Sequence, residues 1–169
     1  MTPLADGQYI FTLLKKLKLA CISIYQICKA QSHGEITART QQTAWVIKND
    51  RYIDPLQAYL QDLCALVTSL KQQKISILIA GDFNEDTTDY GLLHYLQVQH
   101  GMIHLAQNQP TSTYIRGIQC IDHALVTTEI LPYITHFECQ DYPNEYYSDH
   151  RPMILCLKIP TSHVPSSQK

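Results

Sequence analysis

Three short segments of the chain carry acidic, amide or imidazole side chains where predicted strands begin or end. They are residues 81–84 (Gly-Asp-Phe-Asn), 121–123 (Ile-Asp-His) and 148–152 (Ser-Asp-His-Arg-Pro). Together they supply the groups needed for metal-assisted hydrolysis of a phosphate ester. These are carboxylates for a divalent ion, an amide, and an imidazole with a carboxylate that could orient it. The spacing therefore indicates hydrolytic chemistry at phosphate.

Each segment taken alone has a simpler structural explanation. Gly, Asp and Asn all form turns, so residues 81–84 and 148–152 could be loops facing solvent. Asp122 lies within an apolar stretch, and it could be a solvated residue on an edge strand. The functional interpretation depends on all three segments meeting in the folded chain.

The chemistry of the individual side chains favours such a meeting. Asp82 and Asn84 follow a buried strand, and sheets of α/β proteins place their sites at this end of their strands. Asp122 must be paired or solvated because burying a lone carboxylate is costly. Asp149 is a hard oxygen ligand suited to Mg²⁺. His150 can exchange its proton near neutral pH.

The elements that would position these groups follow from the apolar pattern. Asp54-Pro55 predicts a helix start, with apolar residues at helical spacing up to residues 71–74. Residues 75–80 predict a strand covered on both faces. A second helix is expected to open at residues 86–89 and to end before Gly101.

The remaining segments predict a chain that is richer in strands. Residues 17–25 alternate as a strand does, and the polar stretch 26–50 is either a functional loop or partly helical. Residues 1–16 are weakly patterned, and residues 160–169 are predicted to be a disordered tail. One α/β domain over residues 17–159 is the expected organisation. Further extended segments are predicted at residues 113–116, 120–126, 133–139 and 153–159.

Composition excludes several classes of protein. The 169 residues are 45% hydrophobic and 17% charged with a net charge of -2, which excludes a disordered chain and a strongly basic nucleic-acid-binding module. No apolar run is long enough to span a membrane. The six cysteines form no C-x-x-C pair, so we expect reduced, buried thiols and an intracellular protein, nuclear or cytoplasmic.

In this order, the three segments resemble the signatures of the endonuclease/exonuclease/phosphatase superfamily. That group includes apurinic endonucleases, pancreatic-type deoxyribonucleases, inositol polyphosphate phosphatases and retroelement endonucleases. Residues 110–114 and the strand-terminal Tyr25 are similar to further stretches of these proteins, and residues 25–30 and 81–85 resemble the retroelement branch. The resemblance implies a four-layer α/β sandwich, with two packed mixed sheets flanked by helices, and a DNase I-like hydrolase that acts on nucleic acid.

The resemblance also implies a role for each matching residue. Asp82 would align or activate the attacking water, and Asn84 would hold that water or a phosphate oxygen. Asp122 would orient His150, which would contact the scissile phosphate or transfer a proton. Tyr25 would hydrogen-bond the phosphate. Mg²⁺ or Mn²⁺ would be bound by Asp149, with Asp82, Asn84 and His150 as further candidate ligands.

One departure from the superfamily pattern leaves alternatives open. Members begin with a strand that carries an Asn and, further on, a Glu that binds the metal, yet the 24 residues before Tyr25 contain neither Asn nor Glu. The chain thus resembles the C-terminal portion of the domain, with part of the N-terminal sheet missing. The alternatives are an inactive truncated remnant and a phosphatase of inositol phosphates or another small phosphoester.

Overall fold

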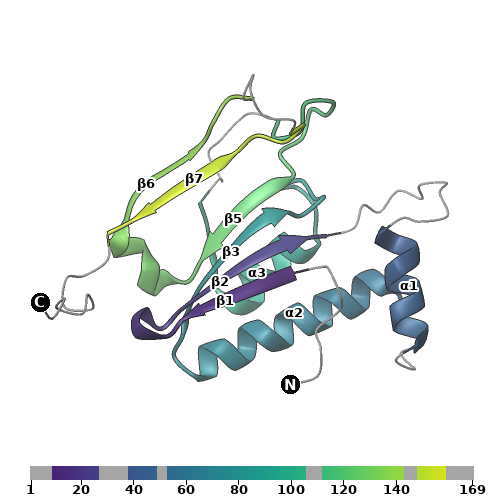
Figure 1. Ribbon diagram of the computed structural model, residues 1–169, viewed down its shortest axis with the longest axis horizontal. Helices are drawn as coiled ribbons and strands as arrows, with labels where there is room; N and C mark the ends of the chain where they lie inside the picture. Colours follow the sequence, from purple (N-terminus) through teal and green to yellow (C-terminus); the bar gives the residue numbers. More distant parts are fainter. Residues whose placement is uncertain (1–8, 27–37, 49–52, 106–111, 143–147, 159–169) are drawn as a thin grey trace, which may run out of the picture.

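The computed structural model describes residues 9–26, 38–48, 53–105, 112–142 and 148–158, which form two β-sheets and a layer of helices (Figure 1). The strands are β1 (Tyr9–Leu14), β2 (Leu19–Tyr25), β3 (Ser76–Asp82), β4 (Ile103–His104), β5 (Asp122–Val126), β6 (Ile134–Cys139) and β7 (Met153–Leu157). The α-helices are α1 (Ala38–Lys48), α2 (Pro55–Gln72) and α3 (Leu92–His100), and two 3₁₀ helices are η1 (Lys15–Leu17) and η2 (Thr128–Tyr133).

The larger sheet has five strands in the order β1-β2-β3-β5-β4. Its β2–β3 pair is parallel, while β1–β2, β3–β5 and β4–β5 are antiparallel. Strand β3 therefore occupies the centre and is covered on both faces, which explains why its sequence is almost entirely apolar.

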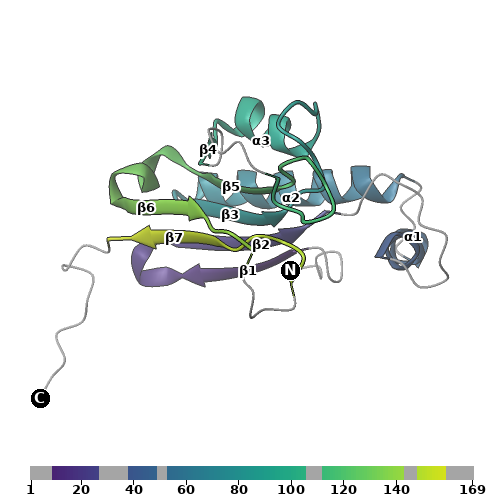
Figure 2. The same ribbon diagram turned by 90° about the horizontal axis from the view of Figure 1, so that it is seen from above.

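Helices α2 and α3 cover one face of this sheet (Figure 2). Helix α2 begins where predicted, because the Asp54 carboxylate accepts hydrogen bonds from the backbone N–H groups of Leu56 (2.9 Å) and Gln57 (3.4 Å). Its apolar face packs on the inward side chains of the strands, and the same core continues to α3. Members of this core include Tyr59, Leu63, Val67, Ile22, Ile77, Ile79, Leu93 and Leu96.

The second sheet, β6–β7, packs on the opposite face of the larger sheet. Strand alternation sends Leu19 and Val126 to this side, where they meet Ile130 of η2 together with Ile134 and Leu157. Figure 1 shows the two-stranded sheet lying beyond β5. The segment before β7, which carries Asp149 and His150, is thereby brought to the start of β5.

The predicted α/β class with two packed sheets is confirmed. The smaller sheet is an antiparallel pair rather than a mixed sheet, and among the described residues α2 and α3 pack on the larger sheet. Helix α1 shows that residues 26–50 are partly helical, as one of the two alternatives proposed.

The boundaries differ from the expectation at several places. Residues 9–14, expected to be weakly patterned, form β1, because pairing with β2 supplies order that the sequence pattern does not show. Helix α3 begins at Leu92 rather than at residues 86–89, since the Asp86 side chain accepts from Thr88 N–H and holds a turn there. The predicted strand at residues 113–116 reduces to one bridge between Tyr114 and His150. The tail, residues 160–169, lies outside the described residues.

Two further expectations concern cysteines and membranes. The expectation of buried thiols is wrong for the five described cysteines, because four of them are only partly buried and Cys156, on the face of β7 that points away from the core, is exposed. Among the described helices, none combines the length and the apolar character that a membrane crossing requires.

The packing predicts which of two apolar side chains contributes more to the free energy of unfolding. Leu63 is fully buried between α2 and the sheet, whereas Val98 of α3 is 61% exposed. We expect Leu63→Ala to lower the free energy of unfolding by roughly 2–5 kcal/mol through lost apolar contact and a residual cavity. Val98→Ala, the matched control, should change it by less than about 0.5 kcal/mol. Urea denaturation measures both, and equal effects would contradict this core.

Candidate functional site

Three of the predicted side chains stand in one row across the larger sheet. Tyr25 at the end of β2 pairs with Asp82 at the end of β3, and Asp82 pairs with Asp122 at the start of β5. Residues directly paired on neighbouring strands project to the same face. The strand register alone therefore brings the two carboxylates and the phenol together.

His150 joins this row through Asp122. Its Nδ1 lies 2.8 Å from Oδ2 of Asp122, whose side chain is 8% exposed. Because a carboxylate only accepts in its ionised form, Nδ1 carries the proton and Nε2 is the ring nitrogen left for chemistry. The predicted orienting pair is thus present, over a sequence separation of 28 residues.

Hydrogen bonds through residues 113–115 hold the segments that carry Asp122 and His150. Ile115 N–H donates to the carbonyl of Asp149 (2.8 Å), and Arg151 N–H donates to that of Thr113 (2.9 Å). The Thr113 hydroxyl oxygen accepts from the N–H groups of Ile121 (2.9 Å) and Asp122 (3.0 Å). Thr113 thereby ties the start of β5 to the loop that presents His150.

The turn after β3 fixes Asn84 beside Asp82. Asn84 adopts a left-handed backbone conformation with φ 46°, which Asn tolerates better than most residues. Its N–H donates to Oδ1 of Asp82 (2.8 Å), and its Nδ2 donates to Oδ2 of Asp82 (3.1 Å) and to the carbonyl of Gln26 (2.6 Å). Gly81 makes this turn feasible, since its φ is 146° and a Cβ there would lie 2.0 Å from the carbonyl oxygen of Ile24.

Burial and neighbouring charges shift the pKa values of Asp82 and His150. Burial raises the pKa of Asp82 to about 6; the backbone N–H of Asn84 lowers it, while the charge of Asp122 raises it. Burial acts to lower the pKa of His150, but the hydrogen bond and charge of Asp122, with the charges of Asp82 and Asp149, raise it above the usual value. Negative charge thus dominates the field at this edge of the sheet.

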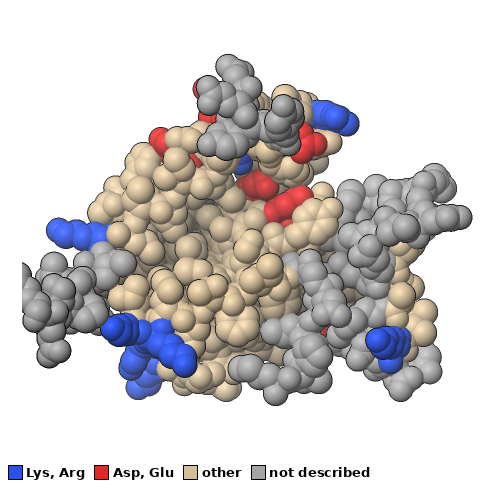
Figure 3. All heavy atoms as spheres, in the orientation of Figure 1, with Lys and Arg blue, Asp and Glu red and all other residues tan. Residues whose placement is uncertain are grey.

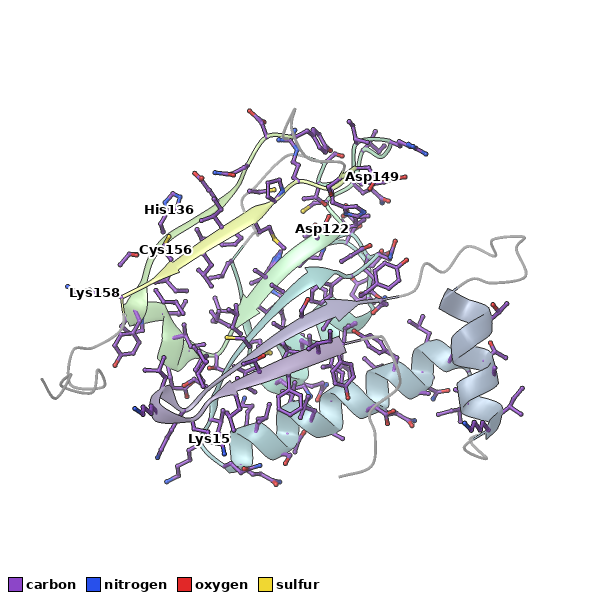
Figure 4. The ribbon with its side chains drawn as sticks, in the orientation of Figure 1. Lys15, Asp122, His136, Asp149, Cys156 and Lys158 are labelled. Atoms are coloured by element: carbon purple, nitrogen blue, oxygen red, sulfur yellow. The ribbon has the colours of Figure 1, made fainter. Side chains whose placement is uncertain are left out.

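Figures 3 and 4 show where these charged side chains lie on the molecule. Figure 3 shows Asp and Glu side chains close together in the upper part of this face, with some basic side chains beside them and others toward the far ends of the molecule. Figure 4 shows Asp122 and Asp149 toward one end, and Lys15 and Lys158 toward the other. The small basic cluster of residues 15–18 is thus remote from the carboxylates.

The predicted metal ligands are only partly assembled. Asp82 and Asn84 are adjacent hard oxygen donors, but the described residues contain no group of three His, Cys, Asp or Glu side chains that could hold a metal. The Asp149 side chain is exposed. Mg²⁺ commonly keeps several waters and binds through one or two carboxylates. The donor set therefore fits part of a magnesium site, not a complete protein cage.

A buried network behind the site was not predicted. Gln26 donates through Nε2 to Oε1 of Glu85 (2.8 Å), and Oε2 of Glu85 accepts from the N–H of Leu93 (3.2 Å). His123 Nε2 lies 2.8 Å from the Glu85 carbonyl, and His104 Nε2 lies 3.0 Å from Nδ1 of His123. The available signal was position, because Gln26 directly follows Tyr25 and Glu85 directly follows Asn84.

Comparison with known sequences identifies the family. A profile described as endonuclease-reverse transcriptase matches residues 47–154, a range that contains Asp82, Asn84, Asp122, Asp149 and His150. This chain belongs to the endonuclease-reverse transcriptase family. The predicted resemblance to the endonuclease/exonuclease/phosphatase superfamily is confirmed. No curated protein sequence matches the chain significantly.

Solved structures show the same fold at low sequence identity. The endonuclease domain of TRAS1, a telomere-specific non-LTR retrotransposon, aligns with a TM-score of 0.55 and 15% identity over 83% of this chain and 56% of that domain. An AP endonuclease from Archaeoglobus fulgidus gives 0.54 and 15% over 90% and 65%. The 3′ phosphatase NExo from Neisseria, bound to a product DNA hairpin, gives 0.51 and 13% over 90% and 71%. This family member therefore spans little more than half of the TRAS1 domain.

Because His104 and His123 are buried, we expect the protein to lose stability at acidic pH. The Glu85 carbonyl can only accept, so His123 is protonated on Nε2 and accepts at Nδ1 from His104. Burial lowers the pKa of His104 to about 4, and burial also lowers that of His123. Below the unfolded pKa of about 6.5 the unfolded chain binds more protons, so stability is full above that pH and is lost as pH falls toward 4.

The measurement is the free energy of unfolding between pH 7 and pH 4.5. We expect a loss on the order of 2 kcal/mol from this pair. His104→Gln keeps a side-chain N–H donor but cannot titrate, so its stability should fall less steeply over the same range. The difference between the two proteins removes contributions from other groups, and parallel slopes would contradict the role of His104.

Proposed function

We propose that this chain forms part of a divalent-metal-dependent phosphodiesterase that cleaves nucleic acid in the manner of a retroelement endonuclease. The observation that carries the proposal is the Asp122–His150 hydrogen bond set directly beside Asp82. An imidazole held by a buried carboxylate, next to a second carboxylate, suits proton transfer and alignment of water at a phosphate. Family membership, and a fold shared with structures of the nuclease and phosphatase type, support this proposal.

Asp82 and Asn84 are proposed to act on the attacking water. The Asp82 carboxylate is held by two hydrogen bonds from Asn84, so its orientation is set before substrate arrives. With a pKa near 6, Asp82 is close to the range in which a carboxylate can accept a proton at neutral pH. Tyr25 ends the adjacent strand with its side chain 46% exposed, where its hydroxyl is proposed to donate to a phosphate oxygen.

Asp122 and His150 are proposed to work as one unit. The carboxylate fixes the ring with Nδ1 protonated, and it stabilises the imidazolium that forms when Nε2 takes up a proton. The raised pKa of His150 supports this, because a protonated ring can contact an anionic phosphate and donate to it.

Mg²⁺ or Mn²⁺ is the proposed cofactor. Asp82 and Asn84 would hold it, with Asp149 as a further ligand, and it would neutralise charge on the phosphate, while Nε2 of His150 is used for the proton. The negative field of the site supports a metal requirement, since two neighbouring carboxylates repel a phosphate unless a cation lies between them. An intracellular location stays a prediction.

A small phosphoester is a second candidate substrate. The net charge of -2 gives no electrostatic attraction toward DNA, and Lys15 and Lys158 lie toward the other end of the molecule from Asp122 and Asp149 (Figure 4). An inactive domain is the third candidate, because the described residues contain no group of three His, Cys, Asp or Glu side chains that could hold a metal.

The proposal is tested by nicking of supercoiled plasmid with Mg²⁺ present. We expect Asp82→Ala, His150→Ala and Asp122→Asn to lower the rate by roughly 10²–10⁴, the usual contribution of positioned acid–base groups. Asp122→Asn keeps the shape of the pair but cannot stabilise an imidazolium. His136→Ala is the control, because His136 is a half-exposed histidine on β6 that pairs with Glu138.

The outcomes separate the candidates. Loss of nicking on chelation with EDTA and in the three variants, with His136→Ala unchanged, supports the endonuclease. Release of phosphate from a small ester without nicking would favour the phosphatase. No hydrolysis of either substrate by the wild-type chain would leave the inactive domain.

A further inference from the structure

A group of lysines lies at the end of the larger sheet opposite to the candidate site. Lys18 comes just before β2 and Lys74 just before β3, whereas Asp82 ends β3. Because β3 is 7 residues long, this end of the sheet lies about 20 Å from Asp82. Figure 4 places Lys15 and Lys158 at this end, and Figure 3 shows several basic side chains close together where Lys15 lies. The lysines therefore form a surface separate from the candidate site.

Two adjoining cavities open among these lysines. One, of about 290 Å³, is lined by Lys18, Lys74 and Lys158, and the other, of about 310 Å³, by Lys71 and Lys74. Among the described residues that line them, Glu129 is the sole acidic side chain. The lysines outnumber this carboxylate, so the electrostatic field around the cavities attracts anions.

The protein itself does not neutralise most of this charge. Lys18, Lys74 and Lys158 are exposed, and none of them forms an ion pair or a side-chain hydrogen bond with another described residue. Lys71 differs, because its Nζ donates to the carbonyl of His100 at the end of α3. The charges of Lys18, Lys74 and Lys158 are thus available to a partner.

Two of these lysines occupy a backbone conformation that favours other residue types. Lys18 has φ 48° and Lys74 has φ 55°, and the remaining described non-glycine residue with positive φ is Asn84 of the candidate site. Both turns are fixed, because Lys18 N–H donates to the carbonyl of Lys15 (3.2 Å) and Lys74 N–H donates to that of Lys71 (2.9 Å). Glycine would fit both turns with less strain. Turn geometry therefore does not explain the lysines, whereas a need for positive charge does.

The spread of these charges favours a polymeric anion over a small one. Lys15 and Lys16 belong to η1, Lys18 and Lys74 precede two neighbouring strands, and Lys158 follows β7. A nucleic-acid strand carries a phosphate about every 3.4 Å, so its charges repeat along such a surface. The candidate site does not supply this attraction, because its own charges are carboxylates.

We propose that Lys15, Lys16, Lys18, Lys74 and Lys158, the lysine surface, bind the phosphate backbone of nucleic acid without reading its sequence. The inference rests on the proposed nucleic-acid substrate and adds a second contact, remote from the site of cleavage. Phosphates held by these lysines keep the substrate on the protein, while the carboxylates at the other end repel it in the absence of a cation. Such contacts position a nucleic acid and carry no sequence information.

Fluorescence anisotropy of a fluorescein-labelled DNA duplex, recorded in EDTA, measures this contact without cleavage. We expect the logarithm of the affinity to fall linearly with the logarithm of the salt concentration, by about 0.9 for each phosphate contacted. Lys18→Gly and Lys74→Gly should each weaken binding by about fivefold to tenfold at about 0.1 M salt, and together they should lower the slope by about two. A duplex of another sequence should bind equally well.

The choice of variants separates charge from structure. Glycine relieves the left-handed backbone, so urea denaturation should show that the double glycine variant is about as stable as wild type. Lys18→Arg with Lys74→Arg keeps the charge and should bind like wild type. Lys48→Ala is the matched control, because it removes an exposed charge from α1, on the opposite side of the molecule (Figure 1). Screening by salt should hold its effect below about twofold.

Each outcome decides for or against the lysine surface. An equal loss of affinity in Lys48→Ala and in the single glycine variants would overturn the proposal, because overall charge would then set the affinity. So would a double variant that binds like wild type, or a wild-type chain that does not bind the duplex, whether or not it binds vesicles of phosphatidylserine.

The binding result is distinct from that of plasmid nicking. DNA binding that depends on Lys18 and Lys74, in a chain that does not nick plasmid, would support the lysine surface and count against the endonuclease. Nicking by a chain whose DNA binding ignores these lysines would do the reverse.

Discussion

The register of β3 with its two neighbours is the constraint on which the candidate site depends. Parallel pairing with β2 and antiparallel pairing with β5 put Tyr25, Asp82 and Asp122 in one row. A slip of one residue in either pair would turn a carboxylate to the helix side, into an apolar core. Core packing opposes this slip, since Ile77 and Ile79 are fully buried on the helix side. Packing of the core and placement of the site are therefore the same requirement.

Placing the carboxylates of Asp82 and Asp122 side by side is electrostatically unfavourable. Asp82 and Asp122 are neighbours at the end of two buried strands, and burial with mutual repulsion raises the pKa of Asp82 to about 6. Each carboxylate is offset by a different partner, Asn84 for one and His150 for the other. A fold selected for stability alone would not keep two carboxylates together here, and such perturbed groups are typical of functional sites.

The sequence predicted the segments of the site better than the edges of the fold. Asp82, Asp122 and His150 could be found because three segments with acidic, amide or imidazole groups occur together at predicted strand ends, and the structure brings these three side chains together. Strand β1 could not, because its order comes from pairing with β2 and not from its own pattern. Residues far apart in the chain, such as Gln26 and Glu85, meet only through the tertiary fold, so no local spacing reveals their contact.

The buried Glu85 carboxylate explains why the turn after β3 holds its shape. It receives Gln26 on one oxygen and the N–H of Leu93 at the start of α3 on the other. Gly91 is required beside it, since a Cβ at that position would lie 1.9 Å from Oε1 of Glu85. Asn84 sits one residue before this anchor and is held by the Gln26 carbonyl. A single buried side chain thus links the residue after β2, the turn after β3 and the start of α3.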